Sequence, residues 1–127
     1  MVKKESGLKS TLKKTILVVD DEPDNRETVQ TVLKAEGYNV ELAKSADDCL
    51  KKYKQKKPDL ILMDIMMPGT PVKEVIPKLN AKVLFLSVVR VSEAEKENLL
   101  GSKNIVGFVQ KPFDIDELTR EVKKQVS

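Results

Sequence analysis

The stretch TILVVDD at residues 15–21 decides the fold. Its first five residues are β-branched or apolar without a break, which is typical of a strand buried on both faces of a sheet. Two aspartates end the run, and Pro23 then suits the first turn of a helix. The stretch LILMD at residues 60–64 repeats this design, because four apolar residues again end at an aspartate. We therefore expect an α/β fold built on parallel strands.

Strands and helices are expected to alternate along the rest of the chain. The expected strands cover residues 15–19, 39–43, 60–64, 82–87 and 106–109, and the expected helices begin near residues 23, 45, 72, 92 and 113. Ser45 is a favourable N-cap, and Ser92 with Glu95 forms a capping box. Pro77 should shorten or kink its helix, because it has no backbone N–H.

The last helix is expected over residues 113–126, with Ile115, Leu118 and Val122 facing the core. Five strands alternating with five helices predict a doubly wound parallel sheet with helices on both faces. In such sheets, functional sites lie at the carboxyl ends of the strands.

The composition limits the kinds of site that the chain can build. Its 127 residues suit a single domain. With no histidine and a single cysteine, Cys49, the chain cannot form an internal disulfide, a Cys/His zinc site or a histidine-based triad. Any metal must therefore be held by oxygen. Because no apolar run is long enough for a membrane span and the start lacks a signal-peptide core, we expect a cytoplasmic location.

The net charge of +3 arises in the N-terminal tail. Residues 1–14 contain five lysines and one glutamate, so this segment carries +4. We expect residues 1–14 to form a flexible lysine-rich tail and residues 15–127 to form the folded domain. Contact with nucleic acid or acidic lipid is one interpretation of such a tail, but a solvated segment is the more common one. We assign the tail no function.

Charged and polar residues follow the expected strands at one edge of the sheet. Asp20 and Asp21 follow the first strand, Asp64 ends the third, Ser87 ends the fourth and Lys111 follows the fifth. Three converging carboxylates repel one another unless a hard cation such as Mg²⁺ neutralises them. We expect phosphoryl transfer, in which Asp64 attacks phosphorus and Mg²⁺ with Lys111 balances the charge. Ser87 would donate a hydrogen bond to the transferred group.

Each of these residues also has a purely structural interpretation. Paired aspartates can cap the following helix, serine is common at strand ends, and a lone lysine is usually a surface charge. Taken singly, each residue is better explained in this way. Taken together, they share one edge of one sheet, and Asp64 follows four apolar residues, where an unpaired buried charge would be costly. The joint functional interpretation is therefore favoured.

Four motifs occur in order, each after its expected strand: ILVVDDEP at residues 16–23, DLILMDIMMPG at 59–69, Ser87, and FVQKPF at 108–113. Through these motifs the chain resembles the response regulator receiver domains of two-component signalling, in particular stand-alone receivers of the chemotaxis type. The resemblance implies a flavodoxin-like α/β fold with five parallel strands in the order 2-1-3-4-5 and helices on both faces.

The resemblance also implies roles for the site residues. Asp64 would be the phosphoacceptor. Mg²⁺ would be held by Asp21, Asp64 and the backbone carbonyl of Met66, with Asp20 as a further acidic group acting on the metal. Lys111 would contact the phosphoryl group. The domain would not be an enzyme beyond catalysing its own phosphoryl uptake and loss.

Phosphorylation would act through a switch. In the family, the hydroxyl that corresponds to Ser87 moves towards the phosphoryl group and the aromatic that corresponds to Phe108 turns inward. The face formed by the fourth helix, the fifth strand and the fifth helix then changes shape for partner binding or phosphorelay. Pro112 would follow the cis peptide bond usual in the family. A sensor histidine kinase would be the phosphodonor and a downstream protein the target, with no attached DNA-binding domain.

The sequence departs from the family pattern in the region after Asp64. The segment from Asp64 to Ser87 is shorter than usual, and Val88 stands where alanine or glycine is common.

The main alternative is a degenerate receiver that acts as an unphosphorylated docking module, against which the intact site residues argue. A small-molecule phosphatase would need a D-x-D motif and a cap. A flavodoxin-like FMN carrier would need a Ser/Thr/Gly loop where this chain has acids.

Overall fold

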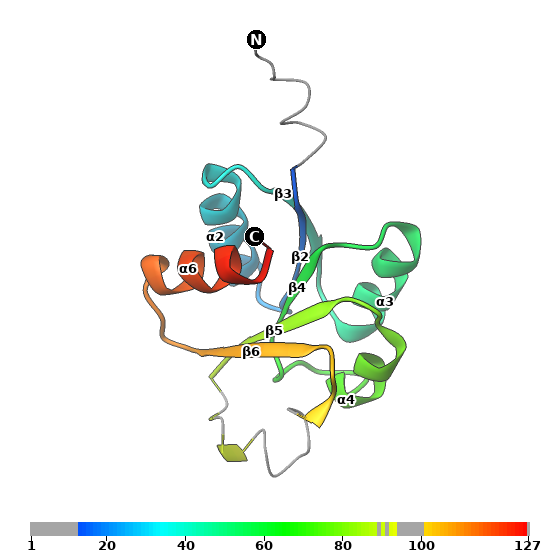
Figure 1. Cartoon of the computed structure of the whole chain (residues 1–127). Helices are drawn as coiled ribbons and strands as arrows, with labels where there is room; N and C mark the ends of the chain where they lie inside the picture. The colour runs from blue at the N-terminus through cyan, green and yellow to red at the C-terminus, as the bar shows by residue number, and fades with distance from the viewer. Residues whose placement is uncertain (1–12, 89, 91, 94–100, 127) are drawn as a thin grey trace.

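Five parallel strands form the sheet (Figure 1). The structure is a computed structural model that describes residues 13–88, 90, 92–93 and 101–126. The strands are β2 (Thr15–Val19), β3 (Asn39–Ala43), β4 (Leu60–Met63), β5 (Lys82–Ser87) and β6 (Ile105–Gln110). Their order across the sheet is β3-β2-β4-β5-β6, and every neighbouring pair is parallel. When the five strands are numbered in chain order, their order in the sheet is 2-1-3-4-5, which confirms the expectation.

Helices cover both faces of this sheet. They are α2 (Pro23–Ala35), α3 (Ala46–Gln55), α4 (Val72–Val75) with the 3-10 turn η1 (Ile76–Lys78), and α6 (Ile115–Val126). The helices α2 and α6 lie on one face, and α3 and α4 lie on the other (Figure 1). In β2, Ile16 and Val18 pack in the core with α2 and α6, whereas Leu17 and Val19 pack in the core with α3 and α4. Burial on both faces explains the continuous apolar strands.

Local sequence signals set the ends of the helices. The Ser45 hydroxyl accepts a hydrogen bond of 3.0 Å from the backbone N–H of Asp48, which caps α3 as expected. Gly37, with a φ of +95°, follows the end of α2 in the left-handed conformation that favours glycine. Pro77 confirms the expectation of a shortened helix, because α4 has only 4 residues and the chain continues as η1.

The expectation that Ile115 faces the core is wrong. Leu118 and Val122 are buried, but the Ile115 side chain is 56% exposed. Because helical side chains lean towards the N-terminus of their helix, Ile115, the first residue of α6, points beyond the helix end and misses the sheet. Among the described helices, none combines the length and the apolar character that a membrane-spanning helix needs.

Two expectations concern residues outside the described ranges. Most of the helix expected from the capping box of Ser92 and Glu95 falls there, and so do residues 1–12 of the expected tail.

The pairing of β5 with β6 is irregular at one point. Val83 is paired with Ile105, but the next residue, Leu84, is paired with Gly107. A Cβ atom at Gly107 would lie 2.8 Å from Cδ1 of Leu84, so only glycine fits here without displacement of its neighbour. Beyond this point the pairing is regular again, and Phe108 lies opposite Phe85.

Candidate functional site

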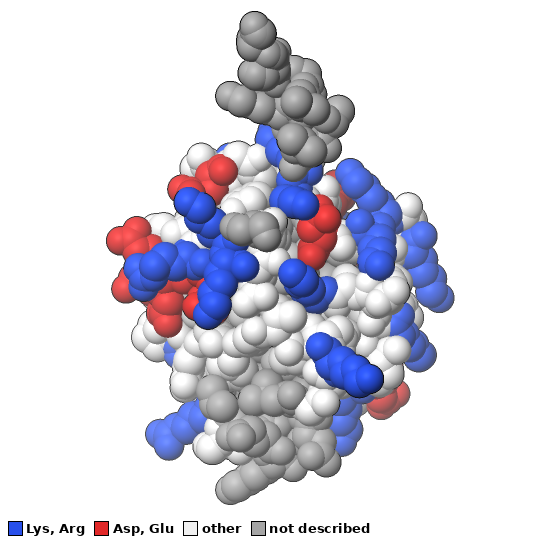
Figure 2. Space-filling view, viewed as in Figure 1, with Lys and Arg blue, Asp and Glu red and all other residues white. Residues whose placement is uncertain are grey.

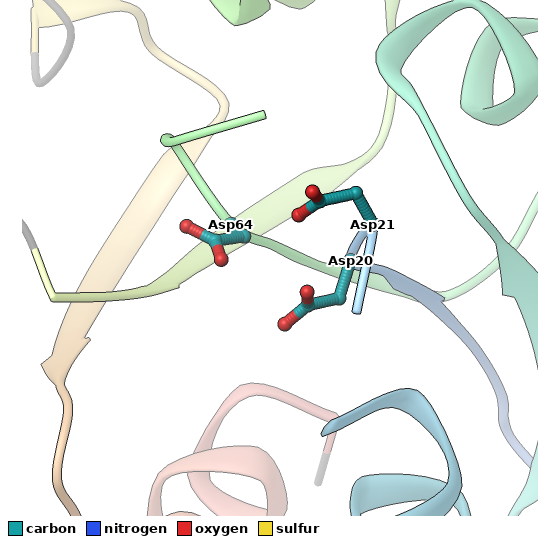
Figure 3. A group of neighbouring side chains, drawn as sticks. All are labelled: Asp20, Asp21 and Asp64. Atoms are coloured by element: carbon teal, nitrogen blue, oxygen red, sulfur yellow. The ribbon is translucent and has the colours of Figure 1, made fainter. Parts of the chain in front are cut away.

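The carboxyl ends of neighbouring strands bring the expected acidic residues together. Asp20 and Asp21 follow β2, and Asp64 follows β4, which pairs with β2. The backbone N–H of Asp64 donates a hydrogen bond of 3.0 Å to the carbonyl of Val19, which holds the two strand ends side by side. Figure 3 shows the three aspartate side chains grouped at this edge of the sheet.

The three aspartates form a candidate metal centre. One carboxylate oxygen from each of Asp20, Asp21 and Asp64 lies within 4.8 Å of the others. Asp20 and Asp64 are buried, whereas Asp21 is partly exposed and leaves the group open to solvent. Three negative charges at this spacing repel one another, and a set of hard oxygen donors is what Mg²⁺ prefers. The residues therefore fit a magnesium ion.

Lys111 contributes the positive charge of the site. Its ammonium group lies 2.9 Å from Oδ2 of Asp20 and 3.3 Å from Oδ2 of Asp64. Burial alone would lower the pKa of Lys111, but the hydrogen bonds and charges of the two aspartates outweigh it and raise the pKa above its usual value. The peptide bond between Lys111 and Pro112 is cis, as the resemblance implied.

The two carboxylate oxygens of Asp64 have different surroundings. Oδ1 accepts hydrogen bonds from the Ser87 hydroxyl at 2.8 Å and from the backbone N–H of Met66 at 3.0 Å. Oδ2 faces the ammonium group of Lys111. Because both oxygens are engaged, the carboxylate is held in one orientation, as a positioned nucleophile requires. Lys111 is itself fixed at the edge, since its backbone N–H donates to the carbonyl of Ser87 at 2.8 Å.

Arg26 supports this site and was not predicted from the sequence. Its guanidinium donates a hydrogen bond of 2.7 Å to the backbone carbonyl of Asp20. The backbone N–H of Glu22 donates to Oδ1 of the same aspartate at 2.9 Å. These two bonds hold the turn between β2 and α2. An arginine near the start of the helix after the aspartate pair was the available signal, because such side chains lean back towards the helix N-terminus.

Phe108, the expected switch aromatic, lies on β6 and is partly buried in the core on the side of α3 and α4. Its ring centroid is 6.3 Å from that of Phe85, in an edge-to-face arrangement. Phe85 precedes Ser87 by two residues on β5, so the two expected switch residues lie on one pair of neighbouring strands.

Three exposed apolar side chains lie close in sequence to residues of the acidic centre. Within the described residues, the large apolar side chains that are exposed are Met66, Val88 and Ile115. Met66 follows Asp64 by two residues, Val88 follows Ser87 directly, and Ile115 starts the helix after Lys111. Apolar side chains are thus exposed near residues that form the charged centre.

The sequence relatives of the chain include longer regulatory proteins. The family described as "Response regulator receiver domain" matches residues 16–123. The chain is 33% identical over 115 residues to the alkaline phosphatase synthesis transcriptional regulatory protein PhoP of Bacillus subtilis, a match that covers 88% of this chain and 48% of that protein. It is 31% identical over 107 residues to the probable transcriptional regulatory protein TcrX of Mycobacterium tuberculosis, covering 82% and 46%. The chain thus spans about half the length of the curated relatives it matches.

Solved structures with the same architecture include two close in length to this chain. A CheY-like response regulator receiver domain protein from Methanospirillum hungatei JF-1 superposes with a TM-score of 0.81 at 25% identity, over 90% of this chain and 94% of that one. The response regulator protein TrrA from Thermotoga maritima, solved in complex with Mg(2+)-BeF, gives a TM-score of 0.77 at 37% identity, over 88% and 98%. In its matched sequence and in its strand order, the chain belongs to the response regulator receiver domain family.

Proposed function

We propose that this domain accepts a phosphoryl group on Asp64 in a Mg²⁺-dependent reaction, and that the modified domain binds a downstream protein. The observation that carries the proposal is the arrangement around Asp64. One oxygen accepts a hydrogen bond of 2.8 Å from Ser87, the other lies 3.3 Å from Lys111, and two further carboxylates lie within 4.8 Å. A lysine alone cannot neutralise three carboxylates, so the centre is suited to a divalent cation and an anionic substrate.

The donor in this proposal is the phosphohistidine of a sensor histidine kinase. A carboxylate oxygen of Asp64 forms a bond to phosphorus while the bond from phosphorus to the imidazole nitrogen breaks, and the electron pair leaves with the imidazole. Lys111 stays close enough to balance charge on the transferred group. The Ser87 hydroxyl, which bonds Asp64 before transfer, then donates to a phosphoryl oxygen. The domain promotes only its own phosphoryl uptake and loss.

The magnesium ion would be held by the three aspartates and by the backbone carbonyl of Met66, in the loop that follows Asp64. When bound, Mg²⁺ supplies positive charge that stabilises the phosphoryl group during transfer. The carboxylate of Asp20 already accepts from the backbone N–H of Glu22 and contacts the ammonium group of Lys111. Asp20 would therefore act from the edge of this ligand set.

We further propose that Ser87 and Phe108 pass the change to the partner-binding face. Support comes from their position on the paired strands β5 and β6, with Phe108 packed against Phe85. The face that would respond comprises β6, α6 and the segment that follows β5. We place these events in the cytoplasm, a reducing compartment that suits the free thiol of Cys49.

Labelling with a small phosphodonor tests the proposed function. Wild-type protein incubated with acetyl phosphate and Mg²⁺ should gain the mass of one phosphoryl group, and removal of Mg²⁺ with a chelator should prevent the gain. Asp64→Asn should remain unlabelled, because the nucleophile is lost while size and packing are kept. Asp47→Asn, an exposed aspartate outside the centre, is the matched control and should be labelled like the wild type.

Two results would count against this function. A labelled Asp64→Asn protein would show that the acceptor is another residue. An unlabelled wild type that is folded and binds Mg²⁺ would favour the alternative of an unphosphorylated docking module.

A further inference from the structure

Exposed lysines gather at the edge of the sheet opposite the candidate site. Parallel strands all begin at this edge, and the helices that precede them end there. Six exposed lysines at this edge are called the amino-edge lysines: Lys13, Lys14, Lys34, Lys56, Lys57 and Lys103. Lys82, which begins β5, is exposed here too, but its ammonium group donates to the carbonyl of Gln125. Figure 2 shows lysine and arginine side chains on several parts of this face of the molecule, with acidic side chains between some of them.

Backbone hydrogen bonds and a shared hollow join most of these lysines into one surface. The N–H of Asn39 donates to the carbonyl of Lys14 at 2.9 Å, and the N–H of Asp59 donates to that of Thr15 at 2.8 Å, so the starts of β2, β3 and β4 are adjacent. A hollow of about 420 Å³ opens at this edge and is lined by Lys13, Lys34, Lys56, Tyr38, Asn39, Val40 and Glu41. Lysines from three separate segments therefore line one concavity.

Favourable interaction with a helix dipole explains only part of the positive charge at the amino edge. Lys34 lies in the last turn of α2, where a cation favours the helix dipole. The other amino-edge lysines lie in loops or at a helix cap. Within the described part of the chain, none of the amino-edge lysines forms a salt bridge. The neighbouring carboxylate of Asp59 already accepts a hydrogen bond from the N–H of Thr15. These lysines are thus available to an external anion.

We propose that the amino edge binds the surface of an anionic lipid bilayer, with the hollow receiving a phosphate headgroup. The lysines are spread across strands spaced about 4.8 Å apart and across the helix layer beside them, so they form a two-dimensional array. An array that extends in two dimensions can meet a bilayer across its width, whereas a rod-shaped nucleic acid duplex would meet only a strip of it.

The kind of cation at this edge also favours lipid over nucleic acid. Arginine binds phosphate in a bidentate manner and is the preferred residue for nucleic-acid recognition. The three arginines of the chain, Arg26, Arg90 and Arg120, lie at the opposite edge or in the middle of α6. Lysine side chains act as flexible point charges, and clusters of them suit the diffuse negative potential of an anionic leaflet.

Binding in this orientation leaves the phosphorylation site free. The acidic centre lies at the carboxyl ends of the strands, so it would face away from the bilayer and remain open to a donor. The proposal does not depend on phosphorylation, and Asp64→Asn should bind vesicles like the wild type.

Vesicle sedimentation tests the proposal. The full chain should sediment with vesicles of phosphatidylcholine containing about one-third phosphatidylglycerol, and should stay in solution with pure phosphatidylcholine. Each lysine near an anionic surface contributes about five-fold to partitioning, so the triple variant Lys13→Gln, Lys34→Gln, Lys56→Gln should bind about a hundred-fold more weakly. Glu41→Gln removes the acid that lines the hollow and should strengthen binding. Higher salt should weaken binding in every case.

A control variant separates the effect of charge at the amino edge from the effect of the net charge of the protein. Lys44→Gln, Lys51→Gln, Lys73→Gln changes the net charge equally at exposed positions away from the amino edge, and should retain binding. The proposal is overturned if the wild type ignores the anionic vesicles, or if both triple variants lose binding equally. It is also overturned if a duplex DNA oligonucleotide binds more tightly than the vesicles under the same conditions. Unchanged melting curves would show that the variants are folded.

Discussion

The Ser87 hydroxyl donates a hydrogen bond of 2.8 Å to Oδ1 of Asp64, and both residues are buried. The bond joins the last residue of β5 to the residue that follows β4. A hydrogen bond to a charged acceptor is shorter and stronger than one between neutral groups, and burial strengthens it further. The donor and the proposed nucleophile are thus held as a unit before any substrate arrives.

Replacement of Ser87 should therefore affect stability as well as phosphorylation. Ser87→Ala should lower the free energy of unfolding by about 1.5 to 3 kcal/mol, because a buried hydrogen bond to a charged group is lost. Ser87→Thr keeps the hydroxyl and should cost less, although its extra methyl group must be accommodated in a packed position. Urea denaturation measures both values. Equal stability of Ser87→Ala and the wild type would show that this bond contributes nothing to the fold.

Removal of one carboxylate should have opposite effects with and without magnesium. Without Mg²⁺, Asp21→Asn should be more stable than the wild type, because like-charge repulsion in the cluster is reduced. At Mg²⁺ concentrations a hundredfold above Kd, the wild type should gain about 2.7 kcal/mol, and Asp21→Asn should gain much less. Thermal melting with Asp24→Asn as the control tests this. A wild-type melting curve that does not respond to Mg²⁺ would rule out the metal centre.

The exposed side chain of Ile115 should matter for a protein donor and not for a small one. Ile115→Ser removes an exposed apolar side chain from the first residue of α6, soon after Lys111 in the chain, and burial of such a side chain contributes about 1.5 to 3 kcal/mol. We expect phosphotransfer from a histidine kinase that phosphorylates the wild type to slow by about tenfold or more. Labelling by acetyl phosphate should be unchanged and serves as the internal control. If phosphorylation by the kinase and by acetyl phosphate slowed equally, the defect would lie in phosphoryl transfer and not in docking of the kinase.

The buried thiol predicts a loss of stability at high pH. Burial, with a smaller contribution from the charge of Asp48, raises the pKa of Cys49 to about 12. The thiol of the unfolded chain has a pKa of about 8.5, so its stabilising contribution is complete below that pH and declines as pH rises towards the folded value. Relative to Cys49→Ala, the wild type should lose about 1.4 kcal/mol per pH unit above pH ~8.5. Urea unfolding at several pH values tests this, and a constant difference between the two proteins would contradict it.

The strands and the position of the site could be predicted because they depend on local sequence. Continuous apolar runs identify strands buried on both faces, and the residue after each run must lie at the carboxyl edge. This reasoning placed Asp20, Asp64, Ser87 and Lys111 on one edge, where the structure brings them together. The short α4 was predictable for the same reason, because Pro77 acts on its own helix.

Features that depend on how one element packs against another could not be predicted in this way. The hydrogen bond from Arg26 to the carbonyl of Asp20 depends on how the first turn of α2 meets β2. The exposure of Ile115 depends on where α6 begins relative to the sheet. The need for glycine at residue 107 arises only because Leu84 on the neighbouring strand occupies the space beside it.

Leu84 fills the place where a side chain at Gly107 would stand, so β5 and β6 interlock mechanically. If one strand slid along the other, Leu84 would meet Val106, whose side chain packs on the same face of the sheet. The strand pair therefore resists shear and keeps Phe108 opposite Phe85. A signal that crosses this pair must travel by rotation of side chains about their own bonds, while the backbone beneath them stays in register.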